Sequence, residues 1–229
     1  MTLLQIVSDT AAHVATAVAP PVPEKMTLWG LLSKGGWLMY PLYLLFFIAI
    51  FVFFERLLTI RKASKVDPNF MRIIRDNIVN GNLQSAKSFA KNVDSPVGTI
   101  IAKGLSRLGS PLSVIEKSME NTGRLALYDL ERNLNILSLV AGIAPMFGFL
   151  GTIVGMVQLF YEINTTGNFE LNVIAGGIYV KMVTSGTGLI IGLLAYIAYN
   201  YLSTQVDKTA NKMEAASAEF IDILQEPTH

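Results

Sequence analysis

The sequence predicts an all-α integral membrane protein with three transmembrane helices, and three observations lead to this fold class. The chain of 229 residues is 52% hydrophobic and only 15% charged, whereas water-soluble domains contain about 25% charged residues. Its mean hydropathy is +0.45. Residues 35–56, 133–161 and 171–201 each reach the roughly 20 apolar residues that a helix needs to cross a bilayer about 30 Å thick.

The composition argues against several classes of function. The 18 basic and 17 acidic residues nearly cancel, at a net charge of +1, so a nucleic-acid-binding protein is not indicated. The chain has no cysteine, and its two histidines, His13 and His229, stand near opposite ends. A thiolate site, a histidine metal site or a catalytic triad therefore lacks its side chains. We expect no enzyme activity, no metal and no cofactor.

The distribution of basic residues predicts the orientation in the membrane, since short loops rich in Lys and Arg stay on the cytoplasmic side. Residues 57–132, together with Arg56, hold 13 of the 18 basic residues against seven acids, whereas residues 162–170 contain two acids and no base. We therefore expect residues 57–132 to form a cytoplasmic loop and residues 162–170 a periplasmic or extracellular one. Residues 1–34 would then lie on that same outer side, and residues 202–229 would form a cytoplasmic helix.

The first 34 residues are predicted to form an amphipathic segment followed by a proline-rich linker. Ala17-Val18-Ala19 imitates the small-residue cleavage site of a signal peptide. This stretch has no positively charged start, carries Asp9 and lacks a solid apolar run, so we expect no cleavage. The run Pro20-Pro21-Val22-Pro23 is typical of a stiff, extended linker.

Helical spacing and helix breakers predict that the cytoplasmic loop is also helical. Gly81 is predicted to end one helix in a turn between two asparagines. Ser95-Pro96 and Ser110-Pro111 each place a capping hydroxyl before a proline that suits the first helical position. We expect the helix after Ser110-Pro111 to run unbroken into the second span, and the C-terminal tail to extend the third span as a helix.

The second and third spans each carry a face of small residues. These faces consist of Gly148, Gly151, Thr152 and Gly155, with Pro145 one turn earlier, and of Lys181, Ser185, Gly188 and Gly192. Each face contains a GxxxG pattern, which lets membrane helices approach closely. Tight helix packing is one explanation of the pattern. The other is a ring of helices around a cavity with Thr152 and Ser185 as its regular polar groups, and with Pro145 freeing a carbonyl for a bend.

Lys181 is the one charged residue between the ends of the three predicted spans. It stands about 15 Å from the start of the third span, near the bilayer centre. A lysine there costs about 2.5–3.5 kcal/mol on insertion scales and usually faces a protein interior or water. Its spacing to Ser185 and Gly188 puts it on the small face, and a side chain that snorkels to the surface is the alternative. Because the spans contain no carboxylate or histidine between their ends, any acid of a proton pathway must come from another chain.

The second and third spans resemble the MotA/TolQ/ExbB family of proton-channel proteins, most closely its ExbB/TolQ branch. The resemblance is carried by AGIAPMFGFLGTIVGMVQLF at residues 141–160 and AGGIYVKMVTSGTGLIIGLLAYIAYN at residues 175–200. Weaker agreement at Glu55-Arg56 and Ser95-Pro96 extends it over roughly residues 35–205. Length, number of spans and orientation also agree with that branch.

This resemblance implies a homo-oligomer, a pentamer around a central pore in the bacterial inner membrane. The pore would hold the single membrane helices of an ExbD/TolR-like dimer, whose aspartate titrates. Proton entry would then drive work delivered through a TonB-like protein to outer-membrane transport. The resemblance assigns the pore threonines of the family to Thr152 and Ser185. Where many relatives carry a membrane glutamate, this chain has Val180 followed by Lys181. We hypothesise that Lys181 biases the charge of the partner's aspartate, since a nearby opposite charge lowers a carboxyl pKa.

Two alternative functions also fit the sequence. A TolQ-like role, or that of a gliding or flagellar stator, differs in what the motor drives, although flagellar relatives usually have four spans. A passive membrane scaffold, whose glycine faces merely assemble helices, belongs to a different class. Proton uptake by vesicles that contain the chain and its partner distinguishes the scaffold from the channel.

Overall fold

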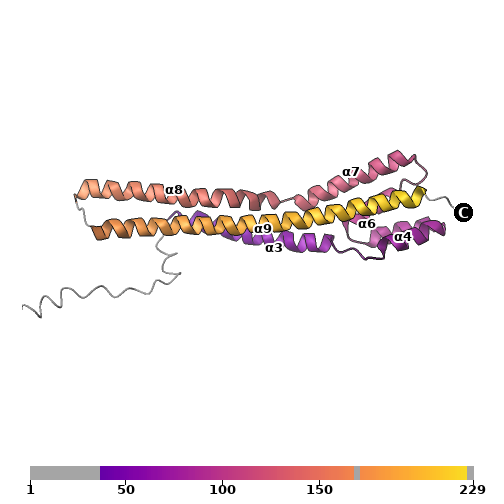
Figure 1. The fold of residues 1–229 in the computed structure, drawn as a ribbon, viewed down its shortest axis with the longest axis horizontal. Coiled ribbons are helices and arrows are strands. Elements are labelled where there is room, and N and C mark those ends of the chain that lie inside the picture. The colour runs from indigo at the N-terminus through magenta and orange to yellow at the C-terminus, as the bar shows by residue number, and fades with distance from the viewer. Residues whose placement is uncertain (1–36, 168–170, 226–229) are drawn as a thin grey trace, which may run out of the picture.

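The structure is a computed structural model that describes residues 37–167 and 171–225, and all regular elements within these ranges are helices (Figure 1). Three stretches are long and apolar enough to span a membrane, namely Met39–Ala63, Leu112–Thr166 and Ile174–Gln225. The predicted all-helical fold with three candidate spans is therefore confirmed. The predicted N-terminal segment and linker, residues 1–34, lie outside the described residues.

Two long helices run side by side along the molecule, and shorter helices gather at one end (Figure 1). The described helices are α3 (Met39–Ala63), α4 (Phe70–Val79), α5 (Leu83–Asn92), α6 (Pro96–Leu105), α7 (Leu112–Glu131), α8 (Leu134–Thr166) and α9 (Leu171–Gln225). The most extensive contact joins α8 to the antiparallel N-terminal part of α9, and α3 packs against both. Helices α4, α6 and α7 pack against the C-terminal part of α9, and α5 packs against α4 and α6.

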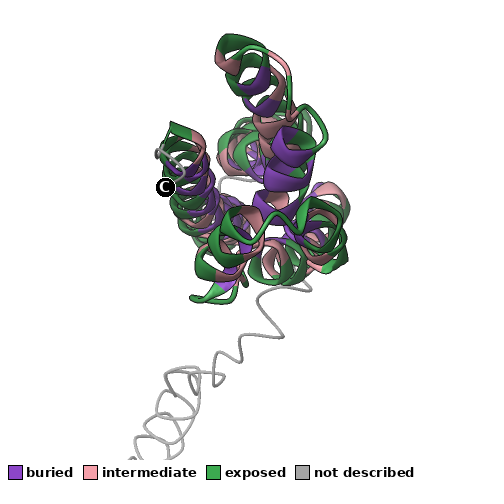
Figure 2. Cartoon of the chain, turned by 90° about the vertical axis from the view of Figure 1, so that its right-hand side faces the viewer, coloured by how far each residue is buried: buried purple, intermediate pink, exposed green. Residues whose placement is uncertain are grey.

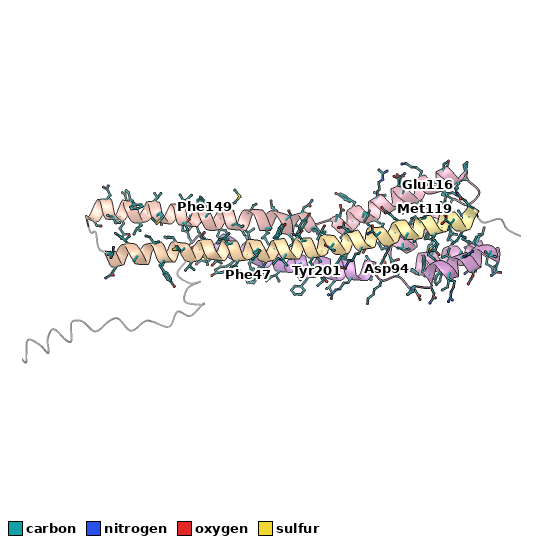
Figure 3. All side chains as sticks on the ribbon, in the orientation of Figure 1. Phe47, Asp94, Glu116, Met119, Phe149 and Tyr201 are labelled. Carbon is teal, nitrogen blue, oxygen red and sulfur yellow. The ribbon has the colours of Figure 1, made fainter. Side chains whose placement is uncertain are left out.

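The spanning helices expose large apolar side chains on their outer surfaces. Phe47 and Phe51 of α3 are 66% and 72% exposed, and Met146 and Phe149 of α8 are 70% and 63% exposed. Phe47 and Phe149 can be followed on the outside of the helices in Figure 3. Soluble monomers rarely expose apolar surface of this extent. Such surface is expected of helices that contact lipid or other subunits.

Two separate buried clusters hold the molecule together, and α9 contributes to both. The first lies between α3, α8 and α9, with buried residues such as Leu42, Leu137 and Leu202. The second lies among α4 to α7 and the C-terminal part of α9, with Ile101 and Phe220 among its buried residues. Viewed from this end, the buried residues face inward between the helices (Figure 2). Helix α9 therefore connects the membrane part to the helical bundle at the other end, and α7 also contributes to both clusters, with Leu130 in the first and Met119 in the second.

The contact between α6 and the end of α9 depends on a glycine. A methyl group added at Gly104 would lie 2.6 Å from Cε1 of Phe220 and 2.7 Å from Sδ of Met119. Phe220 has no exposed surface and Met119 is almost fully buried. The C-terminal tail continues the third span as one 55-residue helix, and this packing holds the end of that helix against α6. The prediction that the tail extends the third span is confirmed.

The second span, in contrast, is not continuous with the helix before it. Helix α7 ends at Glu131 and α8 begins at Leu134. Between them Asn133 adopts a left-handed conformation with φ of 66°, which asparagine tolerates better than most residues. The prediction of an unbroken helix is therefore wrong at this point. The turn changes the direction of the chain so that α7 can pack against α6 and the far end of α9 (Figure 1).

A buried arginine joins α3 to the chain next to this turn. Arg56 donates from Nε and Nη2 to the carboxylate of Glu55, and from Nη1 to the backbone oxygen of Asp129 at 3.2 Å. Only 7% of Arg56 is exposed, although lysine and arginine are rarely buried unless paired. This interaction fixes the C-terminal half of α3 against the end of α7.

The outer face of α7 is polar and solvated. Glu120 accepts hydrogen bonds from Lys117 and Arg124, at the i,i+3 and i,i+4 spacings. These bonds, from Lys117 and then Arg124, lower the pKa of Glu120 to about 2. All three side chains are well exposed, and exposed ion pairs contribute little to stability. This arrangement supports a solvated helix face.

The two Ser-Pro pairs of the loop behave differently. Ser95 caps α6 as predicted, because its Oγ accepts from the backbone N–H of Gly98 at 3.1 Å and Pro96 is the first helical residue. Helix α7 instead begins at Leu112, with Pro111 before it and no side-chain cap. Ser110 belongs to the preceding turn, in which its N–H donates to the oxygen of Arg107 and Gly109 has φ of 93°. The predicted cap at Ser110 is therefore wrong.

We predict that Ser95→Ala lowers the free energy of unfolding by about 1 kcal/mol, because it leaves the Gly98 N–H without its acceptor. Ser110→Ala is the matched control, since it removes a hydroxyl before proline that caps no helix. Thermal unfolding of both variants in detergent, followed by circular dichroism, measures the difference. Equal effects of the two substitutions would contradict the assignment of the cap.

Candidate functional site

The small faces of α8 and α9 meet each other within one chain, and the backbones come closest at Gly148 and Gly188. A methyl group added at Gly188 would lie 2.6 Å from the backbone oxygen of Ala144 and 2.9 Å from Cα of Gly148. One added at Gly148 would lie 3.2 Å from Cα of Ser185 and 3.2 Å from Cα of Gly188. No side chain fits between these backbones. The two glycines therefore set the distance between the helices.

The proline of α8 lies in the same contact. Pro145 is within α8, and because it has no N–H, the carbonyl of Ala141 receives no helical hydrogen bond from it. A methyl group added at Gly192 would meet Cγ of Pro145 at 2.5 Å and the oxygen of Ala141 at 3.0 Å. Gly192 thus makes room for the proline ring, and the freed carbonyl faces α9.

One turn further along, a threonine that sequence reasoning missed faces Gly151. Thr184 is only 1% exposed, and a methyl group added at Gly151 would lie 2.8 Å from its Cγ2. Its hydroxyl donates to the oxygen of Val180 at 3.5 Å. The helical spacing could have revealed it, since Thr184 lies three residues after Lys181 and four before Gly188. Thr184 is the most buried hydroxyl of the α8–α9 contact.

The side chain of Lys181 crosses α8 at Gly155. A methyl group added at Gly155 would overlap Cγ, Cδ and Cε of Lys181, so the aliphatic stem runs directly over the α-carbon of Gly155. Lys181 is half-buried and Gly155 is buried. The structure therefore brings this lysine onto the small face, in agreement with its predicted position.

The two hydroxyls assigned to the pore by resemblance lie at the edge of this contact. Thr152 is half-buried, and its Oγ1 donates to the oxygen of Phe149 at 2.6 Å. Ser185 is also half-buried, with its backbone against Gly148. Neither side chain is enclosed by the helices of its own chain. Both can therefore be reached from outside the single subunit.

The site is built from small residues and one positive charge, with no acid between the ends of the spans. Among the residues that the structure describes, no group of three or more histidine or acidic residues could hold a metal ion. The arrangement offers hydroxyls and an ammonium group in an apolar wall. It can position a charged or hydrogen-bonding group of another molecule.

Residues 92–215, more than half of the chain, match the MotA/TolQ/ExbB proton channel family. The chain belongs to this family. The matched region includes the whole of α8 and α9 as far as residue 215, and so all the residues described in this site. The MotA/TolQ/ExbB family is a family of transport channels rather than of enzymes.

Individual relatives include both ExbB and TolQ proteins. An ExbB homologue of Methanothermobacter thermautotrophicus is 24% identical over 189 residues, 82% of this chain and 67% of that protein. The biopolymer transport protein exbB1 of Vibrio cholerae is 35% identical over 88 residues, 38% of this chain and 39% of that protein. The Tol-Pal system protein TolQ of Pseudomonas aeruginosa is 25% identical over 226 residues, 92% of this chain and 97% of that protein.

The close approach of α8 and α9 gives a prediction for this family member. Gly188→Ala forces a methyl group against backbone atoms of α8, so the helices must separate, and we expect a loss of about 1–3 kcal/mol in stability. Gly186→Ala, two residues away on the same helix, has nothing within 4 Å of the added methyl group and should be neutral. The melting temperatures of the two variants in detergent test this. Equal melting temperatures would show that the helices do not touch at Gly188.

Proposed function

We propose that this chain is the channel and stator subunit of an ExbB–ExbD-type motor that converts proton motive force into mechanical work for TonB-dependent outer-membrane transport. The observation that carries the proposal is the family match, which covers the whole of α8 and the contact that α8 makes with α9. A proton that crosses the membrane releases about 2.3 kcal/mol per 100 mV of potential. That energy would be the input of the motor.

The proposed pathway runs along the wall that α8 and α9 form. Thr152 and Ser185 would present hydroxyls to it, and Lys181 would supply a positive charge. The glycines at 148, 151, 155, 188 and 192 would shape the wall indirectly, because their own faces are filled by the partner helix of the same subunit. The two explanations of the small faces, tight helix packing and a cavity lined by hydroxyls, are thereby combined. The glycines would serve the packing, and the hydroxyls would serve the pathway.

A complete pathway needs more than one chain. We propose a homo-oligomer, a pentamer, around an ExbD/TolR-like single-span dimer that supplies a membrane aspartate. The exposed apolar surface of α3 and α8 supports contacts with lipid and with other subunits. A TonB-like protein would receive the work. The excess of basic residues in 57–132 supports an inner-membrane orientation with this loop in the cytoplasm and residues 162–170 in the periplasm.

A TolQ-like role is the main alternative within the family. The TolQ of Pseudomonas aeruginosa aligns over 97% of its length, so the comparison with that protein spans nearly all of it. The two roles differ in the partner of the motor. Co-purification of a small single-span protein, and identification of the periplasmic protein that it binds, separates TonB-type from Tol-type function. A gliding or flagellar stator would instead be recognised by loss of motility when the gene is deleted.

A passive scaffold is the alternative from a different class. It is favoured by the observation that the glycine faces pack against each other within one subunit. Glycines that serve only to pack helices would be arranged in this way. Vesicles that contain the chain and its co-purified partner distinguish the two. The proposed channel predicts acidification of the lumen when a potential is applied, and a scaffold predicts none.

We predict that Thr152→Val abolishes this proton uptake and leaves the oligomer intact, because it removes a hydroxyl but nearly preserves side-chain volume. Thr204→Val is the matched control, since Thr204 makes the same kind of hydrogen bond to its own helix, to Asn200, beyond the apolar part of α9. Lumen pH reports uptake, and size-exclusion chromatography reports assembly. A fully active Thr152→Val variant would refute the role of Thr152 in the pathway.

A further inference from the structure

Lys181 carries a positive charge in the apolar part of the molecule, and its position is fixed by its neighbours. It lies ten residues into α9, about 15 Å from the helix start at 1.5 Å per residue. Its stem rests on Gly155 of α8, which is itself deep within that helix. The surrounding residues of both helices are apolar or small.

Among the residues that the structure describes, the ammonium group of Lys181 forms no ion pair with a carboxylate. None of the ion pairs in residues 37–167 and 171–225 involves Lys181, and no span has an acid between its ends. The next acid along α8 is the exposed Glu162, about 10 Å beyond Gly155 along the helix axis. A charge in a medium of low dielectric constant attracts an opposite charge far more strongly than in water. Within the described residues Lys181 therefore has no counter-charge, and a carboxylate from another chain would supply one.

We propose that Lys181, positioned by Gly155, is a binding site for a carboxylate carried by a transmembrane helix of another chain. A water-borne anion would have to leave its hydration shell to reach this depth, whereas a membrane helix already carries its carboxylate in apolar surroundings. The site deepens the proposed function and rests on it only for the identity of that chain. Its binding chemistry requires an acid on an apolar helix and nothing else.

Gly155 is a positioning residue of this site, and it differs from the other glycines of the contact. At Gly148 and Gly188 an added methyl group meets backbone atoms, so substitution must separate the helices. At Gly155 the three nearest atoms all belong to the flexible stem of Lys181. Gly155→Ala therefore moves the lysine side chain while α8 and α9 stay together. This makes it a selective probe of the lysine conformation.

Snorkelling is the competing explanation for Lys181. Side chains on a helix lean toward its N-terminus, which for α9 is the end next to residues 162–170. A lysine that merely reaches toward this end would be satisfied by water or by Glu162. It would then show no preference for a carboxylate on another helix. The two explanations differ in a measurable binding preference.

The test uses the full chain in lipid vesicles with a synthetic transmembrane peptide as the probe. The peptide has about 20 apolar residues with one central aspartate, and a second peptide has asparagine at that position. Energy transfer between labelled chain and labelled peptide measures the affinity of each. We expect the aspartate peptide to bind at least about tenfold more tightly, which corresponds to about 1.4 kcal/mol. Equal affinity of the two peptides would overturn the site.

Variants assign the preference to Lys181 and Gly155. Lys181→Met should abolish the preference, and Lys181→Glu should transfer it to a peptide with a central lysine. Gly155→Ala should reduce the preference at an unchanged melting temperature, whereas Gly142→Ala, which has open space around its added methyl group, should leave it unchanged. An unaltered preference in Lys181→Met would overturn the site, and an unaltered preference in Gly155→Ala would overturn the positioning role.

Further measurements separate this proposal from its competitors. If Lys181 pairs with Glu162 of its own chain, Glu162→Gln creates a preference that the unmodified chain lacks, and this result would contradict the site. Proton uptake is measured on the same vesicles with the co-purified partner. A clear preference for aspartate without proton uptake refutes the channel function and supports the site. Uptake that survives in Lys181→Met, with partner assembly unchanged, shows that the lysine does not serve the channel.

Discussion

The contact between the backbones of α8 and α9 at Gly148 and Gly188 is the constraint on which the rest of the membrane part depends. Because the two helices touch there without side chains between them, their relative register is fixed. That register then determines which other residues of α8 and α9 lie opposite one another along the antiparallel contact. It places Pro145 against Gly192 in one direction and Lys181 against Gly155 in the other. The glycines have no functional side chain, but they determine which side chains of α8 and α9 meet in the site.

The length of α9 extends this constraint beyond the membrane part. The helix contributes Leu202 to the cluster shared with α3 and α8, and Phe220 to the cluster of the helical bundle. The helical backbone runs without a break from Lys181 to the bundle along α9, whereas the chain between α7 and α8 turns at Asn133.

Features that depend on neighbouring residues could be predicted from the sequence, whereas features that depend on packing between distant helices could not. Apolar length predicts the three spans, and the hydroxyl of Ser95 before Pro96 predicts a cap, because both depend on neighbouring residues only. The turn at Asn133 depends on α7 reaching α6, which no local pattern records. Thr184 was missed because helical spacing accommodates either Thr184 or Ser185 on the small face. Only the contact with Gly151 selects Thr184 as the buried residue.

In the channel that we propose, the charge of Lys181 would connect assembly to conduction. In the oligomer that we propose, each added subunit would bring one ammonium group to the same level of the wall, and rings of lysine repel cations. Such a ring of subunits alone would be a poor pathway for protons. Carboxylates from a second chain would neutralise the positive charge and at the same time provide the titrating groups that the spans lack. The pathway would then open to protons only in the complete complex, which would protect the membrane from leakage through unpartnered subunits.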